Sequence, residues 1–418
     1  MVVCIPATGA VCNPGDIAWV ITATALVMIM TPGLGFFYGG LVRRKNLVST
    51  IVQCMAIFAV VSLAWAVWGY TMAFGPSVLG GFIGNFQYFG LNGVGSAADT
   101  AYSSTIPALL FFAFQLKFAA ITPALIIGAF AGRIRLKPLL IFILAWVTFI
   151  YFPVAHWIWG VGGWLHVMGV EDFAGGMVVH TTAGVSALAA ALVIGRGVDF
   201  GKESRPNNVP YVILGTAILW FGWFGFNAGS SLSANDVAVN ALVTTNLAAA
   251  ASGVAWMLMD WTLKGKPSAV GMCIGFVCGL AAVTPAAGFV SPALAMVIGV
   301  VAGVGCNVVA GWRARTKLDD SLDVFACHGV GGMWGTVATG LFASAAISGS
   351  NGLLYGDPHF ALLQMFAVAV VASFAFVGTY VILRVINFFS PLRTSTEEEK
   401  AGLDEVHFGE EAYYPASE

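Results

Sequence analysis

Long stretches with few or no charges recur along the chain from Ile17 to Phe389, and each is about as long as a membrane-spanning helix. A helix needs roughly 20 largely apolar residues to cross a bilayer. Charged residues make up only 9% of the 418 residues, whereas soluble domains carry roughly 25%. Because a helix satisfies its own backbone hydrogen bonds within lipid, the sequence predicts an all-α integral membrane protein.

The apolar stretches divide into eleven predicted transmembrane helices. Their ranges are 17–40, 48–74, 106–131, 138–158, 175–195, 211–229, 238–263, 269–285, 291–312, 324–345 and 360–389. The first fifteen residues have no Lys or Arg and no sustained apolar core, so they do not resemble a cleavable signal peptide. We predict an extracellular segment (1–16), a first five-helix repeat (17–195), a cytoplasmic loop (196–210), a second five-helix repeat (211–345), an outer loop with a long eleventh helix (346–389) and a cytoplasmic tail (390–418).

The 18 Lys and Arg residues predict the orientation of these helices. All but Lys117 lie in alternate loops, at 43–45, 133–137, 196–205, 264–266 and 313–317, or in the C-terminal region from Arg384 onward. Under the positive-inside rule, these loops and the C-terminus face the cytoplasm, and the N-terminus faces the outside of the cytoplasmic membrane. The net charge of -2 argues against a nucleic-acid partner.

An odd number of helices with the two ends on opposite sides permits an inverted repeat, in which helices 1 to 5 correspond to helices 6 to 10. The last helices of the two halves have weakly similar sequences. Helix 5 opens with Asp172 in DFAGG and carries His180, and helix 10 opens with Asp323 in DVFAC and carries His328. The two histidines could therefore meet near the middle of the bilayer.

His180 and His328 are the main candidates for function, because an ionisable side chain at membrane depth marks a functional site by default. The alternative is that each ring simply bonds a neighbouring helix. A neutral imidazole pair suits a small polar solute in an apolar passage, since its nitrogens donate and accept hydrogen bonds without leaving a full charge in lipid. Such a pair could also relay a proton.

The other four histidines are expected to have no role in the pore. His407 lies in the polar tail, and His359 and His166 lie in outer loops, so all three are predicted to be solvated. His156 lies at the outer end of helix 4, where packing is favoured over a pore role.

Two acids and two aromatic pairs complete the set of candidates. Asp172 is suited to cap helix 5, and its charge would also favour a cation at the outer mouth. Asp323 begins helix 10 on the cytoplasmic side and is assigned to structure. Aromatic pairs share one helix face at Phe114 with Phe118 and at Trp223 with Phe226. These pairs suit helix packing, or an aromatic cage for a cation together with a hydrophobic gate.

Cysteines and catalytic groups give little sign of further chemistry. Five cysteines lie in apolar segments and are read as packing residues: Cys54, Cys273, Cys278, Cys306 and Cys327. Cys4 and Cys12 could form a disulfide, although their spacing does not require one. No nucleophile–base pair and no cluster of metal ligands is apparent, so we expect neither an enzyme nor a metal or other cofactor.

Five stretches of the chain resemble the ammonium transporter family (Amt/Mep/Rh), and their combination is highly specific. They are PGLGFFYGGLVRRKN (32–46), FQLKFAAITPALIIGAFAGRIR (114–135), DFAGGMVVH (172–180), GWFGFNAGS (222–230) and DVFACHGVGGMWGTVATGLF (323–342). The resemblance is to the Amt branch, of bacterial or archaeal type. It implies an eleven-helix bundle with an inverted repeat, assembled as a homotrimer in which each subunit has its own pore.

The resemblance also implies a role for each candidate. Trp159, Phe118 and Ser230, with Asp172 nearby and Phe114 beside Phe118, would recruit ammonium or methylammonium at the outer face. The gate would be Phe118 with Phe226, and the pore would contain His180, His328 and Trp223. The family is thought to deprotonate ammonium and pass ammonia along the histidines, and the sequence does not choose between net NH3 and net NH4+. The tail resembles a regulatory segment that packs under the trimer and helps a PII-type protein to dock.

Three features depart from the family pattern. Lys117 stands beside the gate, where members usually have an uncharged residue, and it could face the pore, face a subunit interface or extend toward the interface with water. Gly132 replaces a common glutamate, and the segment between Trp159 and Asp172 is one residue longer. Two alternatives stay open: a neutral gas channel of Rhesus type, against which Trp159 and Ser230 argue, and an ammonium sensor that signals through its tail.

Overall fold

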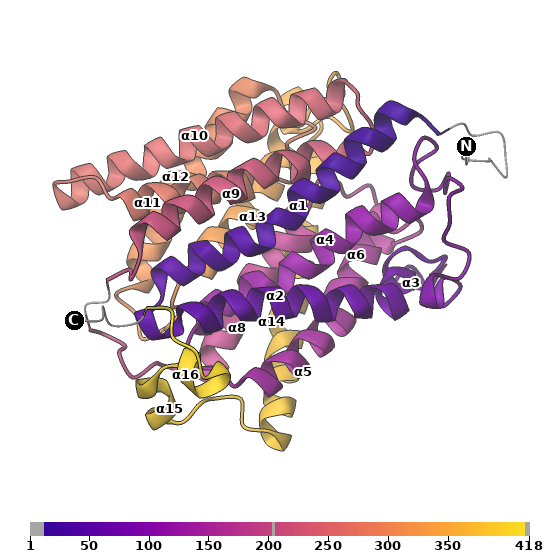
Figure 1. Cartoon of the computed structure of the whole chain (residues 1–418). Coiled ribbons are helices and arrows are strands. Elements are labelled where there is room, and N and C mark those ends of the chain that lie inside the picture. The colour runs from indigo at the N-terminus through magenta and orange to yellow at the C-terminus, as the bar shows by residue number, and fades with distance from the viewer. Residues whose placement is uncertain (1–11, 203–204, 414–418) are drawn as a thin grey trace.

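The computed structural model describes residues 12–202 and 205–413, which form a bundle of helices lying roughly side by side (Figure 1). The first part of the chain contains α1 (Pro14–Leu41), η1 (Arg44–Asn46), α2 (Leu47–Ala64), η2 (Trp65–Gly69), α3 (Tyr70–Phe74), β1 (Ser77–Val78), β2 (Ile83–Gly84), η3 (Phe89–Leu91), α4 (Ala108–Ile126), η4 (Ile127–Phe130), α5 (Leu136–Trp146), η5 (Val147–Tyr151), α6 (Phe152–Trp159), α7 (Trp164–Val167), η6 (Gly176–Thr181) and α8 (Thr182–Ile194). The strands β1 and β2 pair antiparallel as a short hairpin.

The second part contains α9 (Val209–Ala228), η7 (Gly229–Ser231), α10 (Asp236–Lys264), α11 (Ala269–Val283), α12 (Pro292–Arg313), η8 (Phe325–Val330), α13 (Gly331–Phe342), η9 (Leu353–Tyr355), α14 (Pro358–Phe389), α15 (Thr396–Ala401) and α16 (Leu403–Phe408). The elements η2, η5, η6 and η8 are π-helical turns, and the other η elements are 3-10 turns. Each predicted helix has a counterpart whose ends lie within about three residues of the predicted bounds.

Nine helical segments within the described ranges are long and apolar enough to cross a membrane. The predicted helices at 269–285 and 324–345 correspond to α11, which has 15 residues, and to η8 followed by the 12-residue α13. These two are shorter than the nine. A multi-pass helical membrane protein is therefore confirmed, and the count of eleven stays a prediction.

The starts of the long helices follow simple capping chemistry. The side chains of Asn13, Asn235, Ser291 and Asp357 each accept a backbone N–H from the first turn of the helix that follows. A proline also lies in the first turn of α1, α12 and α14, where its missing N–H costs nothing. The short polar loops between the apolar stretches thus determine where each helix begins.

Most of the predicted cationic loops gather at the end of the bundle where the tail lies. Arg43 pairs with Asp199 at 2.8 Å, and Arg135 pairs with Glu398 of the tail at 3.3 Å. Arg196 Nε donates to the carbonyl of Lys317 at 2.8 Å. Figure 1 shows α15 and α16 at this end, opposite to the start of α1. The clusters at 43–45, 133–137, 196–205 and 313–317 thus share one end, as a common cytoplasmic side requires, while the sidedness itself stays a prediction.

The tail packs against the bundle through specific hydrogen bonds. The Asp404 carboxylate accepts the N–H groups of Val48 at 3.0 Å and Ser49 at 2.7 Å, so the tail caps the start of α2. Asn46 Oδ1 in turn accepts the N–H of Leu403 at 2.9 Å. The expectation that His407 is solvated is wrong: it is half-buried in α16, its Nδ1 has no partner, and burial lowers its pKa.

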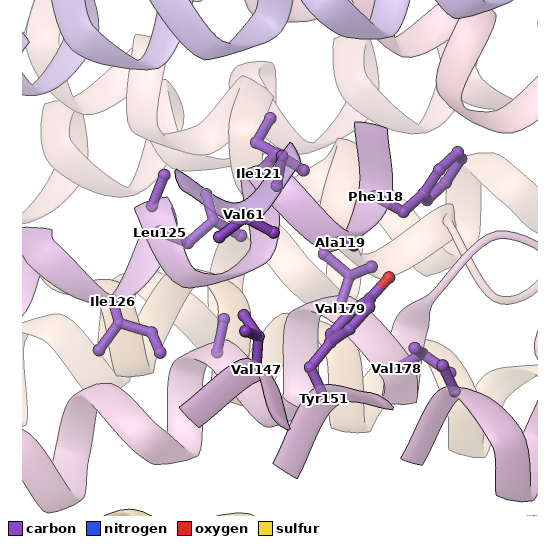
Figure 2. Packing of buried hydrophobic residues seen from close by; sticks show 14 of the residues in the cluster. Val61, Phe118, Ala119, Ile121, Leu125, Ile126, Val147, Tyr151, Val178 and Val179 are labelled. Carbon is purple, nitrogen blue, oxygen red and sulfur yellow. The ribbon is translucent and has the colours of Figure 1, made fainter. Parts of the chain in front are cut away.

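Most of the buried side chains between the helices are apolar. In α4 every residue from Phe118 to Ile126 is buried, which makes this helix the centre of the first half. Figure 2 shows Phe118, Ile121 and Leu125 of α4 among Val61, Val147, Tyr151 and Val179 of other elements. The five cysteines in apolar segments are free and buried, as predicted. The possible Cys4–Cys12 disulfide stays a prediction, because Cys4 lies outside the described residues.

Candidate functional site

A line of aromatic rings leads from the C-terminal end of α6 into the bundle. The Trp159 and Phe118 ring centres lie 6.0 Å apart, with the rings nearly perpendicular at 86°. Phe118 also contacts Phe114 on its own helix at 4.9 Å and Phe226 of α9 at 4.3 Å. Phe114 and Phe118 are both buried. The structure thus brings together the four aromatic residues that were predicted to form the recruitment site and the gate.

The two predicted pore histidines stack directly behind Phe118 and Phe226. The His180 ring lies 5.9 Å from Phe226, 5.3 Å from Trp223 and 5.2 Å from His328, with interplanar angles of 25°, 22° and 19°. His328 Nδ1 and His180 Nδ1 are 3.2 Å apart, within hydrogen-bond distance. Trp223 is held by donation from its Nε1 to Thr284 Oγ1 at 2.9 Å. The prediction that the histidines of the two halves meet is confirmed.

Both histidines lie in π-helical turns, η6 and η8, at the start of their helices. Such turns are rare and are frequent at functional sites. Each histidine is followed four residues later by a glycine that packs against the opposite half. A Cβ on Gly184 would lie 1.9 Å from Gly329 N, and one on Gly332 would lie 2.8 Å from His180 Cβ. These glycines therefore allow the two histidine helices to approach backbone to backbone.

Asp172 organises the start of the first histidine helix. Its Oδ1 accepts the N–H groups of Gly175 and Gly176, and its Oδ2 accepts those of Met177 and Val178, at 2.6–3.1 Å. The predicted capping role is therefore confirmed. Burial raises the pKa of Asp172 above its usual value, while the four amides act in the opposite direction.

The backbone of Asp172 also joins the aromatic site, because its carbonyl accepts Trp159 Nε1–H at 2.8 Å. One residue thus connects the outer tryptophan to the helix that carries His180. Ser230 is connected differently: its hydroxyl donates to the Phe226 carbonyl at 2.8 Å, so its hydrogen points back to its own helix.

The assignment of Asp323 as the cap of the second histidine helix is wrong. Its side chain pairs with Arg313 Nε at 2.7 Å, and its φ of +54° breaks the chain direction just before the helix. Asp320 is the cap instead, accepting Val324 N–H at 3.1 Å and Phe325 N–H at 2.8 Å. Asp320 precedes His328 by 328 − 320 = 8 residues, and Asp172 precedes His180 by 180 − 172 = 8 residues. The sequence contains this equal spacing of eight residues, but the likeness of DFAGG to DVFAC led to the choice of Asp323 as the cap.

A narrow cavity follows the phenylalanine pair. Its volume of about 10 Å³ is roughly the space that one water-sized molecule needs. His180 Nε2 is buried without a hydrogen-bond partner, and His180 and His328 line this cavity. The remaining lining is apolar or aromatic: Met30, Leu34, Phe37, Ile121, Leu125, Val179, Leu219, Trp223, Phe226 and Val277. A solute here would find polar partners only on the histidine rings.

A wider hollow of about 1050 Å³ opens at the end of the bundle where the tail lies. Charged residues dominate its polar lining, and several of them form ion pairs: Arg43 with Asp199, Arg133 with Asp319 and Arg313 with Asp323. They are Arg43, Arg44, Arg133, Asp199, Lys202, Arg205, Arg313, Asp319, Asp323 and Glu399. This mouth therefore differs in chemistry from the aromatic mouth at Trp159.

Lys117 does not line the narrow cavity. Its Nζ lies 5.1 Å from the centre of the Phe58 ring of α2, on a half-buried face of the bundle. The hypothesis that it blocks the pore is therefore not supported.

His156 is also placed outside the pore, where its ring nitrogens contact the Ala73 carbonyl at 2.8 Å and Ser77 Oγ at 3.0 Å.

The contact between the two histidines restricts their protonation. A hydrogen bond between two Nδ1 atoms needs one ring with Nδ1–H and one with a bare Nδ1. In neutral rings the first then has a bare Nε2, which accepts, and the second has Nε2–H, which donates. The pair can therefore offer one acceptor and one donor along the passage. Reversing these roles takes three proton movements: the shared proton moves to the second Nδ1, the second ring gives up its Nε2 proton, and the first ring gains a proton at Nε2.

Comparison with known proteins agrees with this geometry. The model of the Ammonium Transporter Family matches residues 18–413. Ammonium transporter Amt1 of Archaeoglobus fulgidus is 45% identical over 402 residues, which cover 96% of this chain and 100% of that protein. The crystal structure of Saccharomyces cerevisiae Mep2 superposes with a TM-score of 0.87 at 37% identity, covering 92% of this chain and 88% of that one. A structure described as a sensor Amt protein gives 0.86 at 30% identity, covering 94% and 98%.

Proposed function

The chain belongs to the ammonium transporter family, and we propose that it recruits ammonium at Trp159 and conducts ammonia or ammonium past His180 and His328. The observation that carries this proposal is the continuous line of rings from Trp159 through Phe118 and Phe226 to the histidine pair, with ring centres at most 6.0 Å apart.

The outer site suits a small cation. Aromatic faces attract a desolvated cation by up to about 2 kcal/mol, and Trp159, Phe118 and Phe114 supply such faces. Asp172 contributes negative potential close by, since its carbonyl holds Trp159. Ser230 Oγ keeps its lone pairs available as acceptors for an ammonium N–H.

The gate favours loss of a proton before passage. Phe118 and Phe226 are in contact, and the cavity behind them has no acidic side chain in its lining. Burying an unpaired ion in such surroundings is costly, whereas a neutral molecule loses far less on leaving water. We therefore propose that ammonium gives up its proton near the gate and that ammonia passes beside the imidazoles, while the proton either returns to the side it came from or is relayed by the histidine pair. Net transport of NH3 and of NH4+ are both compatible with these steps.

Uptake of labelled methylammonium into proteoliposomes tests the proposal. Wild type should accumulate or equilibrate the label faster than empty liposomes, and Phe118→Ala should alter that rate. His359→Ala is the matched control, because this exposed outer histidine lies away from the passage. Binding of methylammonium without uptake would contradict conduction.

We further propose the assembly and partners that the family resemblance implies. These are a homotrimer with one pore in each subunit, insertion in the cell membrane with the N-terminus outside and in contact with lipid, and docking of a PII-type protein at the cytoplasmic face. The support for a regulatory tail is that Asp404 caps α2, so a protein that moved the tail would also act on a membrane-spanning helix.

An ammonium sensor is the second candidate, favoured by the similarity to the sensor Amt protein and by the tail contact with α2. A neutral gas channel of Rhesus type is the third, and Trp159 and Ser230 argue against it. The uptake experiment separates the sensor from both channels.

A further inference from the structure

Gln364 of α14 forms a two-point contact with the loop that precedes Asp172. Its Oε1 accepts the N–H of Glu171 at 3.2 Å, and its Nε2 donates to the carbonyl of Glu171 at 2.6 Å. Gln364 is fully buried. The amide thus satisfies both backbone groups of one residue, as a neighbouring β-strand would do, and leaves that residue little freedom to shift.

The carboxylate of Glu171 is held by Ser350, in the segment that precedes α14. Its Oε1 accepts Ser350 Oγ–H at 3.1 Å, and its Oε2 accepts Ser350 N–H at 3.3 Å. Burial raises the pKa of Glu171, and the two hydrogen bonds from Ser350 act against that rise. Glu171 is therefore fixed through its backbone by Gln364 and through its carboxylate by Ser350.

The residue that follows connects this anchor to the recruitment site. Asp172 holds Trp159 through its carbonyl, and it caps the helix of His180 through its carboxylate. A movement of the 171–172 peptide would displace the outer tryptophan and the start of η6 together. The contacts among the rings of Trp159, Phe118 and Phe226 do not fix the position of the 171–172 peptide, because they join these rings only to one another.

We propose that Gln364, with Glu171 and Ser350, is a positioning clamp that sets the geometry of the outer site and thereby its apparent affinity for ammonium. This inference rests on the proposed function. The clamp does not touch the ion. It acts by holding Trp159 and Asp172 in place, and displacing groups of a site by about 1 Å can cost up to 100-fold in function.

Ammonium-evoked currents on solid-supported membranes test the clamp. Gln364→Leu removes both hydrogen bonds while keeping a buried side chain, and we expect the half-saturating ammonium concentration to rise about 5- to 10-fold with maximal current within about two-fold. Thr379→Val is the matched control: Thr379 is equally buried in α14, and it bonds Ser186 Oγ at 2.8 Å far from the mouth. It should leave half-saturation unchanged even if the melting temperature falls.

Two further variants keep the test decisive if Gln364→Leu does not fold. Ser350→Ala removes only the hydroxyl donor to Glu171 and should raise half-saturation by about two- to three-fold. Gln364→Glu keeps the acceptor for Glu171 N–H and can donate only when protonated, so its half-saturation relative to wild type should fall as pH is lowered. Unchanged half-saturation in Ser350→Ala and in folded Gln364→Leu, or an equal rise in Thr379→Val, would overturn the clamp. Failure of the proposed function looks different, since wild type would then give neither a current nor uptake of labelled methylammonium.

Discussion

The starts of the two histidine helices use the same device in different surroundings. Asp172 and Asp320 each lie eight residues before a histidine and hold the first amides of a π-helical turn. Asp172 holds four amides and stands beside the aromatic site, while Asp320 holds two and stands beside the Arg313–Asp323 ion pair.

If Trp159 recruits ammonium as proposed, this difference separates the capping device that both histidine helices share from the aromatic site that serves recruitment. The capped π-turn carries the histidine in both helices, which supports a role in placing an imidazole at the centre. The line of aromatic rings ends at Trp159. The mouth at the other end of the bundle is wide and lined by charged residues, several of them in ion pairs. We infer that ammonium is concentrated at the aromatic mouth and released into the charged one.

Removing the caps should produce the largest effect. An unsatisfied buried N–H costs roughly 1–3 kcal/mol, so Asp172→Ala, with four amides exposed to that cost, should be destabilised more than Asp320→Ala, with two. Thermal unfolding in detergent, followed by size-exclusion chromatography, measures both. Equal loss in the two variants would mean that the caps do not differ as their hydrogen bonds indicate.

The aromatic mouth should respond next. Trp159→Leu removes a cation–π partner worth about 1 to 2 kcal/mol, so half-saturation for methylammonium uptake should rise about ten-fold with little change in maximal rate. Trp312→Leu, an exposed tryptophan at the other end of the bundle, is the control. A similar rise in both variants would remove the distinction between the two mouths.

The charged mouth should show its own pH dependence. Burial and the nearby Asp323 carboxylate raise the pKa of Asp320 to about 7, whereas an unfolded Asp titrates near roughly 3.9. Between these values the folded state keeps a proton that the unfolded state has released, so this group's contribution to stability falls as pH rises from about 4 to about 7. Asp320→Asn lacks this loss, and its melting temperature should therefore lie further below that of wild type at pH 5 than at pH 8.

The control for this experiment is Asp236→Asn, which removes an exposed carboxylate from the first turn of α10. Its difference from wild type should be the same at both pH values. A constant difference for Asp320→Asn as well would contradict the raised pKa.

The smallest effect is expected at Lys117. Because its ammonium group lies over Phe58 and outside the narrow cavity, Lys117→Met should leave half-saturation and maximal rate within about two-fold of wild type. Methylammonium uptake measures both. A marked fall in half-saturation would show that this cation opposes recruitment at the aromatic mouth.

Much of this arrangement could be predicted from residue patterns alone. The apolar stretches gave the helices, and the paired histidines gave the centre, because each pattern repeats along the chain. Asp320 was missed because a local likeness, DFAGG with DVFAC, outweighed the spacing of eight residues that the capping geometry requires. The glycines at 184 and 332 could have been found from the same rule, since each follows its histidine by four residues.

Other features leave no local trace in the sequence. Gln364 is one polar residue in a long apolar helix, and its partner is a backbone 193 residues away. Asp404 reads as part of an acidic tail, although it caps a helix 355 residues earlier. Contacts of this kind depend on the tertiary fold, and neither periodicity nor composition reports them.

The most direct test of the central claim is the current from purified protein on a solid-supported membrane after an ammonium concentration jump, with His180→Ala, His328→Ala and the exposed control His166→Ala. If the two histidines conduct ammonia and relay its proton as one unit, wild type and His166→Ala give a saturable current, and either central substitution abolishes it. Saturable current that persists in both His180→Ala and His328→Ala would contradict conduction through the histidine pair.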